Sequence, residues 1–433
     1  MMYLFLNQQF AELSKIKMSM SKFLVTFLIT FFLNQSLVTA QTNSENTEEC
    51  PPKTIFDIFK KNDSLLVVKP IKNNFFLIIP IIGVQPATGF SYGATAQYTF
   101  KGKEALDKYS SANLGVVFTT KKQLMINLKN TILLNNNKIY LTGDSRLYVF
   151  TQPNYGLGTN ILPSKRKDPD FSIESIEEPM DYNYFKVHQS GSWEVSNNFY
   201  VGGGIQIDWY SSIVDKNLDV ENGKFTQHYN YSIQNNFYDK EYFVNGLSLN
   251  FIYDSRDNQI NTRKGWFANA NYRFNLDLFN EQESSNVLYT EFRYFLPLDP
   301  KKQNFVLGFW AFGQFVTNGV VPYLNLPAIG WDQRSRSGEG YTQGLFRGNN
   351  LVYFQSELRF PITCNQVLSG TAFANFTTAS NKIEDVRLFQ YIQPAVGVGL
   401  RLLIDKATRT NLVFDYAAGN KFNGFYLNAG ETF

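Results

Sequence analysis

Apolar and polar residues alternate with a period of two, in segment after segment, from about residue 74 to residue 433. The stretch WFANANYRFNL (266–276) is typical. One parity holds Ala268, Ala270, Tyr272, Phe274 and Leu276, and the other holds Asn269, Asn271, Arg273 and Asn275. Successive side chains of a β-strand point to opposite faces of its sheet, so this pattern predicts strands with one apolar and one polar face. The 16% aromatic content also favours β structure.

The polar face of the predicted strands includes charged residues, and this helps to distinguish a soluble β-sandwich from a transmembrane barrel. In 139–148, Ile139, Leu141 and Leu147 oppose Thr142, Asp144 and Arg146. A soluble β-sandwich also alternates and turns its polar face to outside water, so it is the alternative. A transmembrane barrel turns its apolar face to lipid and encloses the polar face in its lumen. Charged residues mixed with Asn and aromatics on one face, together with an export signal, favour the barrel.

The export signal lies in MSKFLVTFLITFFLNQSLVTAQ (20–41). Lys22 precedes an apolar run from Phe23 to Leu33, and Val38-Thr39-Ala40 provides small residues for cleavage. The run is too short to span a bilayer as a helix, so residues 1–40 are predicted to be a secretory signal peptide. A buried apolar helix is the other interpretation. Residues 41–73 then form a short periplasmic N-terminal segment, with a short helix expected at 54–61.

The alternation predicts sixteen strands. They lie near 75–83, 89–100, 110–120, 123–133, 138–150, 182–195, 199–211, 242–254, 265–276, 286–297, 304–315, 350–360, 366–377, 393–404, 409–417 and 424–433. Their connections alternate between short segments such as 134–137 and 405–408 and long ones such as 151–181 and 316–349. Short turns on one rim and long loops on the other are typical of outer-membrane barrels.

Residues 74–433 are therefore expected to form an all-β, sixteen-stranded antiparallel transmembrane barrel in the cell outer membrane. The even strand count places both termini in the periplasm. The last strand is expected to reach the terminal Phe433 as a lipid-facing ring.

Three stretches resemble one family in its own order. They are DSRDNQINTRKGW (254–266), GEGYTQGLFRGNNLVYFQSELRFPI (338–362) and residues 396–433. Together they resemble the BamA/TamA-like bacterial surface antigens, which are outer-membrane assembly factors. The resemblance covers about residues 240–433 by motif and 75–240 by strand pattern. Residues 41–73 are too short for one of that family's POTRA domains, so a barrel-only member is expected.

The resemblance implies a role in inserting or translocating proteins or lipids at the outer membrane. The expected partners are outer-membrane lipid and periplasmic or membrane proteins that take the place of POTRA domains. A passive or gated pore, or a structural subunit of an envelope complex, is the alternative.

The same resemblance gives a role to Phe346-Arg347-Gly348, in the long loop before the strand at 350–360. In the family this sixth external loop folds into the lumen and docks on the inner wall. A confined arginine needs carboxylates or carbonyls as acceptors, Gly348 permits close backbone approach, and Phe346 adds apolar contact. An exposed Arg347 is the alternative.

Parity turns three candidate partners inward: Asp415, Glu357 and Asn375. Asn375 stands where the family often has an acid. Asp415 is therefore the first candidate partner for Arg347.

The first strand carries Pro80 within FFLIIPIIG (75–83), and the last contains Gly430. Proline has no N–H to donate, and both residues weaken strand pairing. The seam between these strands is thus expected to be weak and to open toward lipid. A bulge in a firmly closed barrel is the other interpretation.

Cys50 and Cys364 are the two cysteines, and both are expected on the periplasmic side. They form either a disulfide or two free thiols.

Other functions find little support in the sequence. His188 and His228 are the two histidines, far apart and without a Ser or Cys nucleophile pattern beside them. The CxxC, HExxH and Walker patterns are missing from the sequence. A barrel lipase is the enzymatic alternative, and we expect no enzyme activity, cofactor or metal. The net charge of +3, with acids and bases mixed, argues against a nucleic-acid partner.

Overall fold

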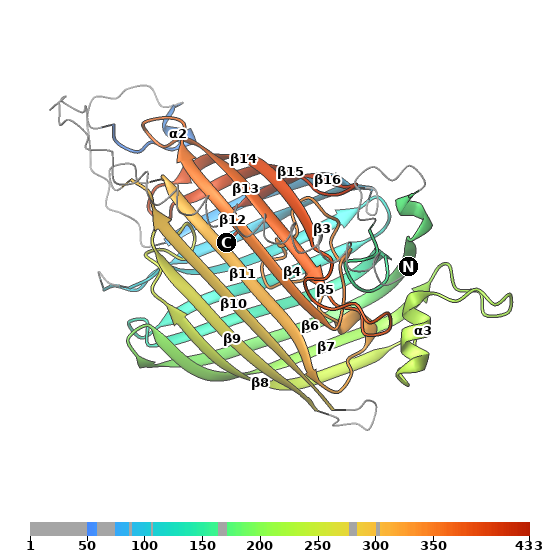
Figure 1. Ribbon diagram of the computed structural model, residues 1–433. Coiled ribbons are helices and arrows are strands. Elements are labelled where there is room, and N and C mark those ends of the chain that lie inside the picture. The colour runs from blue at the N-terminus through green and yellow to red at the C-terminus, as the bar shows by residue number, and fades with distance from the viewer. Residues whose placement is uncertain are drawn as a thin grey trace, which may run out of the picture. The chain divides into compact units, whose positions relative to one another are not determined.

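The computed structural model describes residues 50–58, 74–85, 89–104, 107–162, 171–276, 284–299 and 304–433. The predicted signal peptide (1–40) and most of the segment 41–73 lie outside these residues. Pro51–Phe433 forms one compact unit, shown in Figure 1. Within the described part, no helix has the length and apolarity needed to cross a membrane.

Sixteen strands form one antiparallel sheet in chain order, each hydrogen-bonded to the next (Figure 1). They are β1 (Asn74–Gln85), β2 (Gly89–Phe100), β3 (Ser110–Thr119), β4 (Leu124–Leu134), β5 (Ile139–Asn154), β6 (Glu178–Ser196), β7 (Phe199–Asp215), β8 (Tyr242–Asp254), β9 (Gly265–Leu276), β10 (Ser285–Pro297), β11 (Val306–Asn318), β12 (Asn350–Pro361), β13 (Leu368–Ala379), β14 (Gln393–Asp405), β15 (Thr410–Ala418) and β16 (Asn423–Ala429). The sequence-predicted strand number and order are confirmed, and β2, β8 and β9 have the predicted bounds.

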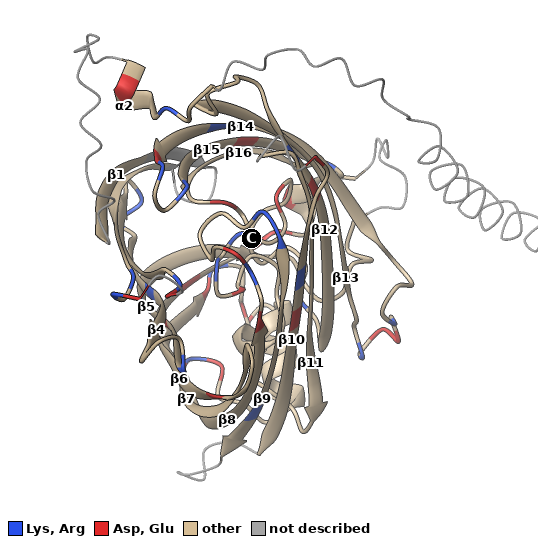
Figure 2. Cartoon of the chain, turned by 90° about the vertical axis from the view of Figure 1, so that its left-hand side faces the viewer, with Lys and Arg blue, Asp and Glu red and all other residues tan. Residues whose placement is uncertain are grey.

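The alternation separates an apolar outer wall from a polar lumen. On β8, Leu247, Leu249 and Phe251 are exposed, whereas Ser248 and Asn250 between them are buried. Figure 2 shows the strands curving around an interior that contains charged residues. The apolar parity faces outward, as a lipid-embedded barrel requires.

Four short helical elements complete the described part: α2 (Ile55–Ile58), η2 (Ile173–Ser175), α3 (Gln227–Gln234) and η3 (Tyr323–Asn325). Thr226 caps α3 by accepting a hydrogen bond from the Tyr229 amide at 3.3 Å. The helix expected at 54–61 is present as α2, and residues 59–61 lie outside the described part.

The segment containing α2 packs on the rim with the short turns. The Lys53 amide donates to the Asn365 carbonyl at 2.8 Å, and Lys406 pairs with Asp57 at 2.9 Å. Burial opposes ionisation of Asp57, but the Thr54 amide and the Lys406 ammonium outweigh it and hold the pKa of Asp57 below its usual value. The contact therefore contributes stability at neutral pH and is lost only as pH falls through that lowered pKa.

Cys50 and Cys364 are both disulfide-bonded, in agreement with one of the two alternatives drawn from the sequence. We expect peptide mapping without reductant to find Cys50 and Cys364 in one cross-linked pair. Reduction should make residues 51–58 more sensitive to protease, because the exposed Lys406–Asp57 pair alone contributes only about 0–1 kcal/mol. Recovery of both cysteines alkylated before reduction would contradict the pairing.

Candidate functional site in the barrel lumen

The connection between β11 and β12, residues 319–349, is called loop 6 here. It folds into the barrel and contacts strands on several sides of it. Arg146 on β5 donates to the Asp332 carbonyl at 2.8 Å, and Lys129 on β4 donates to Ser335 Oγ at 2.9 Å. Across the lumen, Tyr341 donates to the Pro394 carbonyl on β14 at 2.6 Å. Loop 6 therefore spans the lumen.

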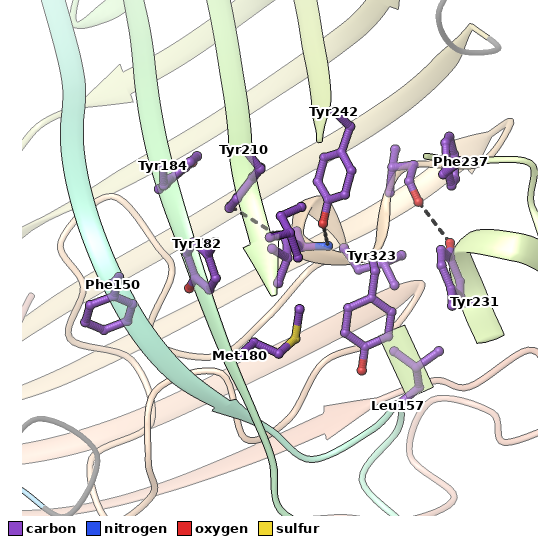
Figure 3. Packing of buried hydrophobic residues seen from close by; sticks show 14 of the residues in the cluster. Phe150, Leu157, Met180, Tyr182, Tyr184, Tyr210, Tyr231, Phe237, Tyr242 and Tyr323 are labelled. Atoms are coloured by element: carbon purple, nitrogen blue, oxygen red, sulfur yellow. Dashed lines mark hydrogen bonds between the residues drawn. The ribbon is translucent and has the colours of Figure 1, made fainter. Parts of the chain in front are cut away.

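The first part of loop 6 is anchored by tyrosines of the wall (Figure 3). Tyr210 Oη donates to the Leu324 carbonyl at 3.3 Å, and the Leu324 amide donates to Tyr242 Oη at 3.2 Å. Tyr323 is fully buried and donates to Asn154 Oδ1 at 2.6 Å. These bonds satisfy the tyrosine hydroxyls while the rings pack as an apolar cluster.

Arg347 stabilises the fold of loop 6 itself. It is buried, and its Nη1 donates to the carbonyls of Tyr323 at 3.1 Å, Leu324 at 3.0 Å and Leu326 at 3.4 Å. The guanidinium also lies over the Tyr323 ring, 5.4 Å from its centroid. Arg347 thus holds the carbonyls at and after η3, and the interpretation of an exposed Arg347 is wrong.

The two neighbours of Arg347 have the roles expected of them. A Cβ on Gly348 would lie 2.1 Å from the Ser380 carbonyl oxygen, so this close backbone approach excludes any side chain. Phe346 is fully buried and packs edge-to-face on Tyr341, with ring centroids 4.9 Å apart.

The expected pairing of Arg347 with Asp415 is wrong. Asp415, Glu357 and Asn375 are all buried, as their parity predicted. Asp415 instead pairs with Arg401 at 2.5 Å, and Glu357 pairs with Arg359 at 2.6 Å. Asn375 does contact loop 6, donating to the Glu339 carbonyl at 3.0 Å.

Strand register explains why Asp415 is not available to Arg347. Gly399 on β14 lies opposite Asp415 on β15, with Arg401 two residues further along the same face. A Cβ at Gly399 would lie 1.7 Å from Asp415 Oδ1, so the glycine leaves room for this carboxylate. Parity gave the face of Asp415, but its neighbour on the wall depends on register.

Most other arginines of the barrel wall pair with an acid that lies two residues earlier in the chain. Four inward-facing pairs have an acid followed two residues later by arginine on the same strand or at its end. They are Asp144/Arg146 at 2.7 Å, Asp254/Arg256 at 2.8 Å, Glu291/Arg293 at 2.7 Å and Glu357/Arg359 at 2.6 Å. The sequence signal for these pairs is the repeated acid-x-Arg spacing, which is present at all four places.

The last residues of the chain leave the sheet and enter the lumen. β16 ends at Ala429, Gly430 has φ of +76°, and Glu431 and Phe433 are each 2% exposed. Phe433 packs against Trp310 and Phe295, with ring centroids 5.6 and 5.7 Å apart. The expectation of a lipid-facing Phe433 is therefore wrong. Gly430 permits the left-handed turn that redirects the chain.

Charged groups hold this inward-turned end. Glu431 pairs with Arg401 Nε at 2.8 Å and accepts from Asn411 Nδ2 at 2.7 Å. Arg336 of loop 6 donates Nη2 to the Ala429 carbonyl at 2.8 Å. Its Nη1 donates to the carbonyls of Gly430 at 2.7 Å and Glu431 at 2.5 Å. We call these three Arg336 bonds the loop 6 clamp. No sequence signal distinguished Arg336 from its neighbours.

The loop 6 clamp acts at the seam. Among the described residues, β1 pairs with β2 and β16 with β15, and no ladder joins β1 to β16. Ile79, Pro80 and Ile81 of β1 line the same cavity, of about 360 Å³, as residues 427–431. The two end strands thus meet across a cavity, and loop 6 contacts the end of β16.

Comparison with known proteins identifies the fold. Residues 196–433, more than half of the chain, match the model of the Omp85 superfamily domain. The chain belongs to the Omp85 superfamily. It is therefore an integral outer-membrane barrel.

Two solved structures of related architecture are similar to this Omp85 barrel. BamA from Haemophilus ducreyi lacking POTRA domains 1–3 has a TM-score of 0.50 at 16% identity, covering 83% of this chain and 69% of that one. CdiB from Acinetobacter baumannii has a TM-score of 0.49 at 14% identity, covering 83% and 60%. No curated protein matched the sequence.

The motif DSRDNQINTRKGW forms more than a tight turn in this Omp85 barrel. Between β8 and β9 it tucks inward, so that Arg256, Asn258 and Thr262 are buried. Asn258 Nδ2 donates to the Thr408 carbonyl at 3.3 Å, and Asn261 Nδ2 donates to the Arg409 carbonyl at 3.1 Å. The segment therefore bonds to the β14–β15 turn on the short-turn rim. We call residues 255–264 the rim plug.

Both histidines have carboxylate neighbours. His188 Nε2 lies 2.9 Å from Asp208 Oδ2, which also pairs with Arg273 at 2.5 Å. His228 on α3 is fully buried, with Nδ1 2.8 Å from Asp215 Oδ2. His188 thus belongs to the polar lumen, as expected, whereas His228 belongs to the loops beyond β7.

The ion pairs predict which substitutions are coupled. Arg401→Gln should cost about 3–5 kcal/mol if the site stays dry, and less if water enters the lumen. Asp415→Asn should cost less than Arg401→Gln, because Arg401 keeps its pair with Glu431. Together they should cost less than their sum, because Arg401→Gln alone leaves the Asp415 carboxylate without its cation. Arg347→Gln and Asp415→Asn should instead be additive within about 0.5 kcal/mol. The measurement is the urea midpoint of the heat-modifiable band on gels. Strong coupling of Arg347 to Asp415 would contradict the observed contacts.

Proposed function

We propose that this Omp85 barrel inserts or translocates proteins or lipids at the outer membrane, using the seam between β1 and β16 as the route to lipid. The observation that carries the proposal is that no ladder joins β1 to β16 among the described residues. Internal neighbours such as β1 and β2 share a ladder of register partners from Asn74 to Gln85. At the seam, the loop 6 clamp bonds only to the end of β16, at Ala429, Gly430 and Glu431.

This difference in hydrogen bonding between the internal strand pairs and the seam determines where the sheet can open at the lowest cost in free energy. Each ladder hydrogen bond contributes about 0.5–1.5 kcal/mol, so separating two fully paired strands costs many such bonds. Separating β1 from β16 breaks no ladder among the described residues. An opening between β1 and β16 is therefore the least costly lateral opening of the sheet.

The lumen contents argue against a passive pore. Loop 6 crosses the lumen from β5 to β14 and β16, and the rim plug bonds across the short-turn rim. A pore would need both segments to move, whereas a lateral route needs only the seam. A structural role in an envelope complex remains the outcome expected if the seam has no activity.

The proposal includes an orientation of the barrel in the outer membrane. The short-turn rim with α2 faces the periplasm, and both termini lie on that side. This rim is where periplasmic partner proteins would dock. The long loops, including the segment with α3, face outward.

A disulfide across the seam should abolish activity. In a background with Cys50 and Cys364 replaced by serine, Ile79→Cys with Asn428→Cys, or neighbouring positions, would tether β1 to β16. The activity is the rate at which the barrel in vesicles promotes insertion of a urea-unfolded outer-membrane barrel. Oxidation should lower it to the rate of empty vesicles, and reductant should restore it.

The control is Ala270→Cys with Thr290→Cys, which are register partners on β9 and β10. This tether joins strands that are already paired and should leave the rate unchanged. Equal behaviour of the two tethered proteins would refute a lateral route and favour a pore or structural role.

Weakening the clamp should loosen the C-terminal residues in the lumen. Arg336→Gln removes charged donors from three carbonyls, at about 1.5–3 kcal/mol for each bond to a charged group. It should increase maleimide labelling of a Thr432→Cys reporter in the cysteine-free background, because Thr432 is buried in the lumen. Arg387→Gln changes the same charge on an exposed loop and serves as control. Unchanged labelling would show that the clamp does not hold the C-terminal residues.

A further inference from the structure

The cavity beside the seam has an unbalanced charge. Five cationic side chains line it, Lys129, Arg256, Arg293, Arg334 and Arg336, against one carboxylate, Glu431. Glu431 is already paired with Arg401. Asp254 neutralises Arg256, and Glu291 neutralises Arg293. Lys129, Arg334 and Arg336 form no ion pair with any described residue, so the lining carries an excess of positive charge.

Two of these side chains have unused donors. The Arg334 side chain makes no hydrogen bond to another described residue, although its backbone amide donates to Asp332 Oδ1 at 2.9 Å. Arg256 is 3% exposed, and its Nη1 has no hydrogen-bond partner. A buried donor without a partner is costly, and a confined guanidinium without an anion more so.

Asp332, the carboxylate nearest to Arg334 and Arg336 in the sequence, does not neutralise their positive charge. Asp332 accepts from the amides of Arg334 at 2.9 Å, Arg336 at 3.2 Å and Ser337 at 3.0 Å, and from Ser337 Oγ at 2.7 Å. Its oxygens therefore shape the turn of loop 6 and form no ion pair with the arginines. This turn places Arg334 and Arg336 in the cavity lining, facing Lys129 of β4, whose ammonium bonds to Ser335.

We propose that this cavity binds a phosphate group, as a free oxyanion or in a lipid headgroup. Near neutral pH free phosphate carries between one and two negative charges and a phosphodiester headgroup carries one, and both have several oxygens that accept from guanidinium groups. The volume of about 360 Å³ is at the lower end for small-molecule sites. Ile79, Pro80 and Ile81 give the seam side an apolar border, which suits the alkyl part of a phosphate ester.

The site does not depend on insertion activity. Free phosphate can bind while the seam is closed, so loss of the seam activity would leave this inference standing. A headgroup additionally requires access from the lipid side.

The first experiment uses the full chain in maltoside detergent and phosphate-free, low-salt buffer. Titration calorimetry with inorganic phosphate should show one saturable site. Arg334→Gln should weaken binding about tenfold, the effect of losing one charged hydrogen-bond donor. Arg387→Gln, the same charge change on an exposed loop, should leave affinity unchanged. If Arg334→Gln lacks a heat-modifiable band, Lys129→Gln replaces it.

The second experiment separates the two sources of phosphate. Native mass spectrometry would compare dioctanoyl phosphatidylglycerol with dioctanoylglycerol, which has the same chains without phosphate. Retention of the phospholipid alone, reduced by Arg334→Gln, supports a headgroup site. Binding of inorganic phosphate without phospholipid retention supports a site for free phosphate. Failure of both ligands, or equal weakening by Arg334→Gln and Arg387→Gln, overturns the proposal.

Discussion

Backbone hydrogen bonding in hydrocarbon is the constraint on which the rest of this structure depends. Each unpaired N–H or C=O at membrane depth costs several kcal/mol, so a β-sheet can cross a membrane only by closing on itself. Fifteen neighbouring pairs of strands meet this requirement with antiparallel ladders. Between β1 and β16, groups outside the ladders must satisfy the backbone N–H and C=O groups. At the end of β16, the Arg336 guanidinium donates hydrogen bonds to three carbonyls.

Loop 6 can hold the end of β16 because it is itself held on both sides. The wall tyrosines bond to the backbone around η3, and Arg347 joins that turn to the segment entering β12. Gly348 brings the same segment against the Ser380 carbonyl. On the other side, Gly340 donates to Tyr426 Oη on β16 at 2.9 Å. A rigid connection therefore runs from the wall at β7 and β8 to the last strand.

The sequence predicted the fold well because alternation is a local property. Strand number, order and inward faces follow from a period of two, which each strand carries in its own residues. Asp415, Glu357 and Asn375 were placed on the correct face for this reason. Partners were harder to predict, because they depend on register and on height along the lumen.

The errors at Arg347 and Phe433 have separate physical causes. The residue two positions before Arg401 on β14 is Gly399, not an acid. Arg401 therefore pairs with Asp415 of β15, and Asp415 is not available to Arg347. Phe433 shares the parity of lipid-facing residues, but one positive φ at Gly430 ends the strand and cancels that parity. A single residue can thus override a pattern that holds elsewhere along the strand.

Charge pairing within single strands explains how so many arginines fit in one lumen. An acid and an arginine two residues apart on one strand lie on the same face whatever the neighbouring register, so the pair forms without tertiary information. Each pair is close to neutral before the barrel closes, which limits the desolvation that closure must impose. Cations of loop 6 have no such built-in partner, since a loop has no fixed alternation. Arg336 donates to backbone carbonyls at the end of β16 and Arg347 donates to the carbonyls around η3. Arg334 is the loop 6 arginine whose side chain has no acceptor among the described residues.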